Sequence, residues 1–225
     1  MARPLNRKKE ETRSLVLHSA SKLFIENGYS NTRIKDIAEE ANVSYNDVFR
    51  LFGEKENILS ELVGLVLEFQ FEKSIEITKE YTDDKLFIYA FETVLQLYVA
   101  EGVEHIREMY LVSYSLPNAS KVVYKTITSK LEDVFKGSLP ELETKDFYEL
   151  EIASAGIMRG YISVPCDMYF TMERKRKRFL ETLFKIYDVP KEKVIDIIKF
   201  IEQFDFKKHA DDLLKSLFNY LESKI

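Results

Sequence analysis

The stretch TRIKDIAEEANVSYNDVFRLFG, residues 32–53, decides the fold of this chain. It contains two short helical patterns separated by the turn Ala41-Asn42-Val43, and Ser44 is positioned to cap the second pattern. Asp47 follows three residues later, the spacing of a capping box with Asp in place of the usual Glu. Asn42 suits a turn with a positive φ, because asparagine tolerates that conformation better than most residues. Two short helices joined in this way form a helix-turn-helix, whose second helix enters the major groove of DNA.

The sequence on either side of this stretch predicts further helices. Residues 8–27 carry an apolar stripe at helical spacing and end at Asn27-Gly28, where glycine can adopt the left-handed cap conformation. Thr32 is expected to cap the helix that follows. Gly53 should end the third helix, and Lys55 should begin a long fourth one.

The remaining chain reads as a larger helical bundle. Residues 86–99 are apolar almost all round, which is typical of a helix buried inside a bundle, and residues 146–163 and 206–225 predict two more helices. Four prolines are expected at helix boundaries: Pro117, Pro140, Pro165 and Pro190. We therefore expect an all-α protein. A helix-turn-helix head would occupy residues 1–54, and a helical domain for effector binding and dimerisation residues 55–225.

Composition and charge narrow the class of protein. Hydrophobic residues make up 45% and charged residues 32%, which is typical of a globular protein and not of a disordered one. Residues 1–50 contain nine Lys or Arg and seven Asp or Glu, a net charge of +2, so the total of −5 leaves −7 for the rest. A mildly basic head on an acidic body suits a DNA contact confined to one end.

The cellular location follows from three further observations. Cys166 is the only cysteine, which excludes an intramolecular disulfide and favours a reducing compartment. No segment approaches the roughly 18 uncharged apolar residues of a membrane span, and no apolar stretch follows the basic N-terminus as in a signal peptide. We expect a cytoplasmic protein that does not bind membranes.

The head resembles the tetracycline-repressor (TetR) family of bacterial transcriptional regulators. The resemblance covers residues 8–60, about a quarter of the chain, and rests on residues in the family's order and spacing: Leu23-Phe24, Gly28-Tyr29, Thr32, Asp36-Ile37-Ala38, Ala41, Val43-Ser44, Phe52 and Lys55. Phe49 departs from the pattern, because the family usually has a phosphate-contacting tyrosine there. Arg50 and Leu51 occupy places often held by His and Tyr, and Asn42 replaces a common glycine.

The resemblance implies a ligand-responsive regulator, most simply a repressor. It would bind a near-palindromic double-stranded DNA operator as a homodimer and leave it when a small-molecule effector binds. The residues expected to contact bases or phosphates are Thr32, Arg33, Lys35, Ser44, Tyr45, Asn46, Asp47, Phe49, Arg50 and Lys55. Asp47 has two interpretations, since its carboxylate can accept from a cytosine amino group or only cap the helix.

The C-terminal part is too divergent for motif matching, so its candidate residues come from residue type and position. Phenol and thioether side chains suit a cavity for an apolar or aromatic effector, although each could equally be an ordinary core residue: Tyr89, Tyr98, Tyr110, Tyr114, Tyr124, Met158 and Tyr161. Small residues and one apolar stripe suit a dimer interface or close packing within the chain: Gly156, Gly160, Ala210, Leu213, Leu217 and Leu221.

Other patterns predict no chemistry. The basic run at residues 174–178 is expected to be a solvated helix face or loop, and Glu141 and Glu143 an exposed one. The three histidines lack the spacing of metal ligands, and no phosphate-binding loop or nucleophile elbow is present. We expect no cofactor, metal or catalytic activity.

Two alternatives to a repressor remain. The first is a small-molecule carrier or enzyme on the same helical fold with a vestigial head, and only Phe49 and Asp47 favour it. The second is an activator, which the residues do not distinguish from a repressor.

Overall fold

The computed structural model describes the backbone of residues 4–222, with side chains for residues 8–217, 219 and 220. This part of the chain is all-α, as predicted, with eleven helices and no strand. The helices are α1 Pro4–Asn27, α2 Ile34–Glu40, α3 Tyr45–Phe52, α4 Lys55–Thr78, α5 Lys85–Gly102, α6 Glu104–Ser113, α7 Pro117–Phe135, α8 Thr144–Ser163, α9 Met172–Ile186, α10 Lys191–Ile201 and α11 Phe206–Glu222. None of them is long and apolar enough to cross a membrane.

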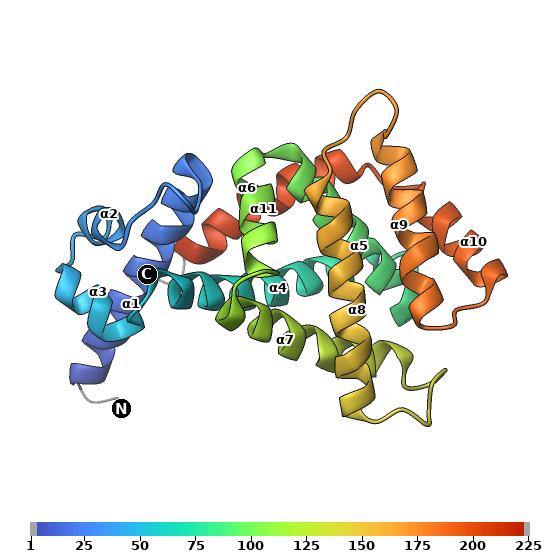
Figure 1. The fold of residues 1–225 in the computed structure, drawn as a ribbon, viewed down its shortest axis with the longest axis horizontal. Coiled ribbons are helices and arrows are strands. Elements are labelled where there is room, and N and C mark those ends of the chain that lie inside the picture. The colour runs from blue at the N-terminus through green and yellow to red at the C-terminus, as the bar shows by residue number, and fades with distance from the viewer. Residues whose placement is uncertain (1–3, 223–225) are drawn as a thin grey trace.

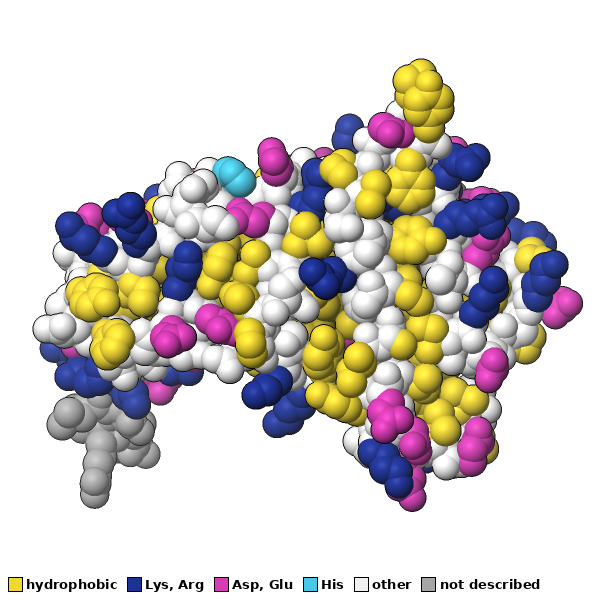
Figure 2. Space-filling view, viewed as in Figure 1, with side chains coloured by type: hydrophobic (Ala, Val, Ile, Leu, Met, Phe, Trp, Pro, Cys, Tyr) yellow, Lys and Arg dark blue, Asp and Glu magenta, His cyan; other side chains and the backbone are white. Residues whose placement is uncertain are grey.

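The molecule is elongated, with α1–α3 forming a head at one end (Figure 1). Helix α4 runs from the head into the larger body, where α5, α7, α8 and α9 pack together. Helix α11 returns from the far end and contacts α5, α4 and α1. Charged side chains cover both ends of the face seen in Figure 2. Head and body are therefore joined by the continuous helix α4 and by the contacts of α6 and α11 with α1.

The local signals around the helix-turn-helix are confirmed. Asn42 has a φ of 52°, and Gly28 and Gly53 have φ values of 84° and 70°. Ser44 caps α3 by accepting a hydrogen bond from the Asp47 N–H at 3.1 Å. The expected cap at Thr32 is wrong, because α2 begins after Arg33 and the Thr32 hydroxyl donates inward to the Gly28 carbonyl at 2.8 Å.

Two apolar cores stabilise the fold, and α4 belongs to both. The head core contains Val16, Phe24, Ile37 and Val48 from α1–α3, together with Ile58, Leu59 and Leu62 from α4. The body core begins further along α4 at Leu67 and includes most of α5, as its all-round apolar pattern predicted. Burial of apolar side chains on a shared helix couples the packing of the two parts.

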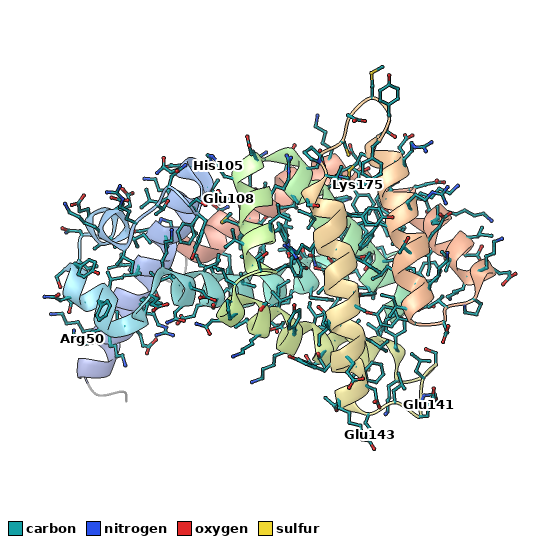
Figure 3. All side chains as sticks on the ribbon, in the orientation of Figure 1. Arg50, His105, Glu108, Glu141, Glu143 and Lys175 are labelled. Atoms are coloured by element: carbon teal, nitrogen blue, oxygen red, sulfur yellow. The ribbon has the colours of Figure 1, made fainter. Side chains whose placement is uncertain are left out.

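The turn between α1 and α2 is held by side chains from the body. Glu108 on α6 accepts hydrogen bonds from the N–H groups of Tyr29, at 3.1 Å, and Ser30, at 3.0 Å. Lys55 at the start of α4 donates to the carbonyls of Tyr29, at 2.7 Å, and Thr32, at 2.8 Å. Nδ1 of His105 lies 2.9 Å from the carbonyl of Ile25 (Figure 3). We call Lys55, His105 and Glu108 the head clamp.

Gly28 makes this contact possible for two reasons. Its φ lies in the region that side-chain-bearing residues rarely adopt, and a Cβ atom there would lie 2.5 Å from Oε2 of Glu108. A second carboxylate joins the start of α4 to α7. Glu56 on α4 accepts a hydrogen bond from the Asn118 N–H at 2.6 Å in the first turn of α7.

We expect Glu108→Ala to loosen the α1–α2 turn without unfolding the protein. A hydrogen bond to a charged acceptor contributes about 1.5–3 kcal/mol, so amide exchange at Tyr29 and Ser30 should accelerate roughly 10- to 150-fold. Hydrogen exchange with residue-level resolution measures this, and Glu104→Ala on the exposed side of the same helix serves as the control. Unchanged protection of both amides in Glu108→Ala would contradict the clamp.

Candidate DNA interface and effector cavities

Helix α3 presents a polar and aromatic face to solvent. Val48 and Phe52 anchor it in the head core, and the opposite side exposes Tyr45, Asn46 and Arg50. Arg50 lies at the outer end of the head in Figure 3. Seven of the ten predicted DNA-contacting residues are exposed, namely Arg33, Lys35, Ser44, Tyr45, Asn46, Phe49 and Arg50.

Tyr45 and Phe49 form an exposed aromatic stack on this face. They are 49% and 55% exposed, with ring centroids 6.2 Å apart and an interplanar angle of 15°. Hydrophobic side chains lie among Lys and Arg side chains at this end of the molecule in Figure 2. Large aromatic side chains left in water on a charged surface are typical of a contact site.

Asp47 is engaged within α3 itself. Its Oδ2 accepts from the Ser44 hydroxyl at 2.7 Å, and its Oδ1 accepts from Arg50 at 2.5 Å. These contacts favour the capping interpretation of Asp47 over a contact with cytosine. The Arg50–Asp47 pair is exposed and therefore weak, so the guanidinium can exchange this partner for a phosphate.

Thr32 and Lys55 face inward, unlike the other predicted contacts. The single hydroxyl proton of Thr32 is used inside the head, and the side chain is only 2% exposed. The Lys55 ammonium lies 4.0 Å from the Tyr29 ring centre, and burial lowers its pKa. Both residues build the α1–α2 turn, so their part in a DNA contact is to position the head.

A first cavity of about 100 Å³ lies where α1, α4, α6 and α11 meet, directly beside the head clamp. Its walls are almost entirely apolar. They include Ser21 and Ile25 of α1, Leu62, Val66 and Gln70 of α4, Ile106, Met109 and Tyr110 of α6, and Leu213 and Leu217 of α11. Helix α1 of the head thus forms part of the wall of a cavity in the body.

One hydrogen-bond acceptor in this cavity lacks a partner. Gln70 is 2% exposed, and its Nε2 donates to the Tyr110 hydroxyl at 2.6 Å. Its Oε1 has no hydrogen-bond partner among the described residues. A buried carbonyl oxygen without a donor is costly, so this atom can orient a ligand that carries an N–H or O–H group.

A second cavity of about 20 Å³ lies deeper in the body, and Tyr114 lines both cavities. Its polar side chains include two acids, Glu92 on α5 and Glu151 on α8. Oε1 of Glu92 accepts from Nε2 of Gln96, and Oε2 of Glu151 accepts from the Ser154 hydroxyl, each at 2.6 Å. Burial is the main cause that raises the pKa of each carboxyl to about 8, and for Glu151 the charge of Glu92 contributes to the increase.

The predicted pocket residues divide into two groups. Tyr110 lines the first cavity, Tyr89 and Met158 the second, and Tyr114 both. Three others line neither cavity and pack against neighbouring rings: Tyr98 on Phe206 at 5.2 Å, Tyr124 on Tyr148 at 6.1 Å, and Tyr161 on Phe179 at 5.6 Å. Sequence reasoning missed Gln70, Glu92 and Glu151, although Glu92 stands out as a charge inside the long apolar run of α5.

The residues predicted for a dimer interface also divide. Gly156 and Gly160 are exposed, and nothing lies within 4 Å of a Cβ atom built on either, so they do not pack within the chain. Ala210 and Leu213 are buried against the body core, and Leu217 lines the first cavity. The apolar stripe of α11 packs on α5 and α4, which is the packing within the chain that stood as the alternative to a dimer interface, and a role of these residues in a dimer stays a prediction. Leu221 lies outside the residues with described side chains.

The basic run on α9 is not uniformly solvated as predicted. Lys175 is 1% exposed, and its ammonium donates to Glu101 and to the Val164 carbonyl, each at 2.6 Å. It ties the α8–α9 loop to α5, while Arg174, Lys177 and Arg178 face solvent. Glu141 and Glu143 are exposed, as predicted.

Comparison with known proteins assigns the head. Residues 16–62 match the model of bacterial regulatory proteins of the tetR family. The head of this chain is therefore similar to proteins of that family. The chain is 24% identical to the HTH-type transcriptional regulator AcrR of Shigella flexneri over 209 residues, which cover 83% of the chain and 94% of AcrR. It is 46% identical to the regulator HbdR of Aromatoleum sp. (strain CIB) over 59 residues, 26% of each protein.

Solved structures extend the likeness to the whole fold. RolR, crystallised with resorcinol, superposes with a TM-score of 0.68 at 17% identity, covering 86% of this chain and 95% of RolR. A TetR-family regulator from Pectobacterium atrosepticum gives a TM-score of 0.53 at 18% identity, covering 80% and 92%. The body of this chain therefore has the same fold as these two proteins.

We expect the free energy of unfolding to fall between about pH 5 and pH 8 because of Glu92 and Glu151. Their folded pKa values of about 8 lie above the unfolded value of roughly 4.3, so the folded state binds more protons throughout this range. Stability then decreases as pH rises, by at most roughly 1.4 kcal/mol per pH unit for each carboxyl.

Urea unfolding at half-unit pH steps measures this decrease. The double variant Glu92→Gln/Glu151→Gln should flatten it, whereas Glu149→Gln on the exposed side of α8 should not. The same slope in the double variant and the parent protein would mean that the two carboxyls ionise like exposed ones.

Proposed function

We propose that this chain is a TetR-family regulator that binds a near-palindromic DNA operator as a homodimer and is released by a small-molecule effector, acting as a repressor in the bacterial cytoplasm. The proposal rests on one observation: packing and hydrogen bonds connect the exposed face of α3 to the first cavity. The exposed face of α3 belongs to a head whose α1–α2 turn is clamped by α6, and α6 also lines the first cavity.

The α3 face has the chemistry for reading base edges in the major groove. The Asn46 side chain can pair bidentately with adenine, and Arg50 can bind a phosphate or guanine. The Tyr45–Phe49 stack offers an apolar surface that fits a thymine methyl group. Phe49 would then contribute base readout in place of the phosphate contact that a tyrosine makes at this position in the family.

The exposed face of α8 is our candidate for the dimer contact. Tyr148, Ile152, Gly156 and Gly160 recur every four residues, so they share one face, and all four are exposed. The two glycines permit close approach of a second helix, while Tyr148 and Ile152 supply apolar surface at 40% and 47% exposure. Two copies of this face across a twofold axis would pair helix against helix.

Release follows from the position of the first cavity. A ligand bound there contacts α1, α4 and α6 at once, and α6 carries His105 and Glu108 of the head clamp. Separating α6 from α1 changes the orientation of the head and hence the spacing of two heads on DNA. The shift is limited by the difference in the ligand's affinity for the two conformations.

Selection of bound fragments from a random DNA pool by the purified, ligand-free protein tests the proposed function. We expect enrichment of one near-palindrome whose half-sites lie about 34–36 Å apart, and light scattering should give two protomers per site. Failure of the folded protein to enrich any sequence at low salt would overturn the proposal.

Variants of the α3 face test the proposed contacts on the selected operator. Asn46→Ala, Phe49→Ala and Arg50→Ala should each weaken binding by about 1–3 kcal/mol, roughly 5- to 150-fold, without changing the thermal midpoint. Replacing thymine by uracil in the operator should weaken binding of the parent protein but not binding of Phe49→Ala. Lys207→Ala, an exposed cation on α11, is the control. Parent affinity in all three variants would place the DNA contact elsewhere.

Filling the first cavity should abolish the response to effector while leaving operator binding intact. Val66→Phe adds a ring to the cavity wall, so ligands from a library of small aromatic compounds that stabilise the parent protein in a thermal-shift screen should no longer do so. Ile195→Phe enlarges an exposed apolar residue on α10 and serves as the control. Retained responses in Val66→Phe would mean that effectors bind at another site.

A further inference from the structure

The second cavity holds two carboxyl groups that form no ion pair among the described residues. Glu92 is 1% exposed and Glu151 is 3% exposed. Oε2 of Glu92, which lines the cavity, has no hydrogen-bond partner among the described residues. The cavity therefore contains an unused, buried oxygen beside a second acid.

The groups that face this cavity supply no positive charge in contact with it. Tyr89 on α5 and Tyr114 at the end of α6 line it, and burial raises the pKa values of both phenols well above the usual range, so they stay neutral. Burial keeps the neighbouring phenols Tyr110 and Tyr187 neutral in the same way, by raising their pKa values. The charge of Lys130 on α7 lowers the pKa of Glu92, but this lysine is engaged elsewhere. Its ammonium lies 3.2 Å from Glu68 at the surface.

Packing does not explain the two acids. Each accepts one hydrogen bond that a glutamine side chain would accept equally well, from Gln96 and from Ser154. Burying a carboxyl group without a partner costs free energy, and burying two close together costs more, because ionising one raises the energy of ionising the other. Acids kept in such a site indicate a ligand that stabilises their charged form.

The volumes of the two cavities limit the shape of that ligand. A cavity needs about 10–15 Å³ to hold a water molecule, and a primary ammonium group is of similar size. The second cavity, at about 20 Å³, admits such a group but not a trimethylammonium group. Tyr114 lines both cavities, so they adjoin at its ring, and an apolar chain attached to the nitrogen would reach the first cavity of about 100 Å³ by displacing that ring.

We propose that the effector is a primary ammonium cation with an apolar body, whose nitrogen binds Glu92 and Glu151 and whose body occupies the first cavity. This inference rests on the proposed function, since it names the chemical class of the molecule that releases the operator. Charge-assisted hydrogen bonds to buried carboxylates are stronger than neutral ones, which gives the cation its advantage over a neutral molecule of the same shape.

Binding of the cation is coupled to proton release. The two carboxyls are largely protonated at pH 7, because burial raises their pKa values to about 8. An ammonium group favours the ionised form, so each carboxyl that ionises passes its proton to the buffer. A neutral ligand in the first cavity leaves the carboxyls protonated and releases none.

Calorimetric titration at pH 7 in two buffers of different ionisation enthalpy tests the proposal. The probes are 2-phenylethylammonium, the neutral 2-phenylethanol and trimethyl(2-phenylethyl)ammonium, with hexyl and 4-phenylbutyl counterparts so that chain length does not decide the result. We expect at least one primary ammonium to bind at least tenfold more tightly than the corresponding alcohol and to release protons on binding. Its affinity should also be higher than that of its quaternary analogue.

Glu92→Gln and Glu151→Gln should each weaken ammonium binding at least tenfold and leave alcohol binding unchanged. Glu149→Gln, exposed on α8, is the matched control. Both glutamine variants keep the hydrogen bonds of the parent protein, and urea unfolding establishes that they fold. Equal affinity for ammonium and alcohol throughout the series, or undiminished ammonium affinity in both variants, overturns the proposal.

A mobility-shift assay with the selected operator separates this proposal from the proposed function. Operator selection uses ligand-free protein, so its failure concerns DNA binding alone. An ammonium that binds as expected should also release the operator from the parent protein and not from Glu92→Gln. Binding without release overturns the assignment of the cation as effector, even where the operator itself is confirmed.

Discussion

The turn between α1 and α2 is the constraint on which the rest of the structure depends. Its backbone is bound by Glu108 from one side and by Lys55 from the other, so two helices of the body determine the orientation of the head. Gly28 suits this turn because its φ of 84° is one that other residues rarely adopt, and a side chain there would shift the Glu108 carboxylate. Helix α3 packs on the same head core, so its orientation relative to the body depends on side chains that lie outside α3.

The first cavity lies beside the same junction of α1 with α4 and α6. The apolar wall of the first cavity includes residues of α1, α4 and α6, the helices that the clamp joins. The second cavity adjoins it at Tyr114 and contains the buried acids Glu92 and Glu151. The second cavity, the first cavity and the head clamp thus lie next to one another, from Glu151 on α8 to the α1–α2 turn of the head.

Local signals in the sequence predicted the head well, and long-range packing accounts for most of what was missed. Asn42, Ser44 and Gly28 act within a few residues, so their roles were readable from neighbours in the chain. In the sequence, Thr32 and Lys55 resemble surface residues that contact DNA. In the structure, carbonyl groups surround both side chains, and the Tyr29 ring lies beside Lys55. The stripe on α11 predicted burial but not its partner, and Glu92 and Glu151 meet only because α5 and α8 cross.

The sharing of α4 between the two cores has a consequence for how such regulators diversify. The head core is completed by Ile58, Leu59 and Leu62, beyond the end of the helix-turn-helix, and by Ala119 from α7. A recombination event that joined a new head at residue 54 would combine half of one apolar core with half of another. Exchange between relatives is compatible with folding only when the crossover falls after Leu62 and the incoming helix fits α7, which ties the inheritance of DNA specificity to that of the body beneath it.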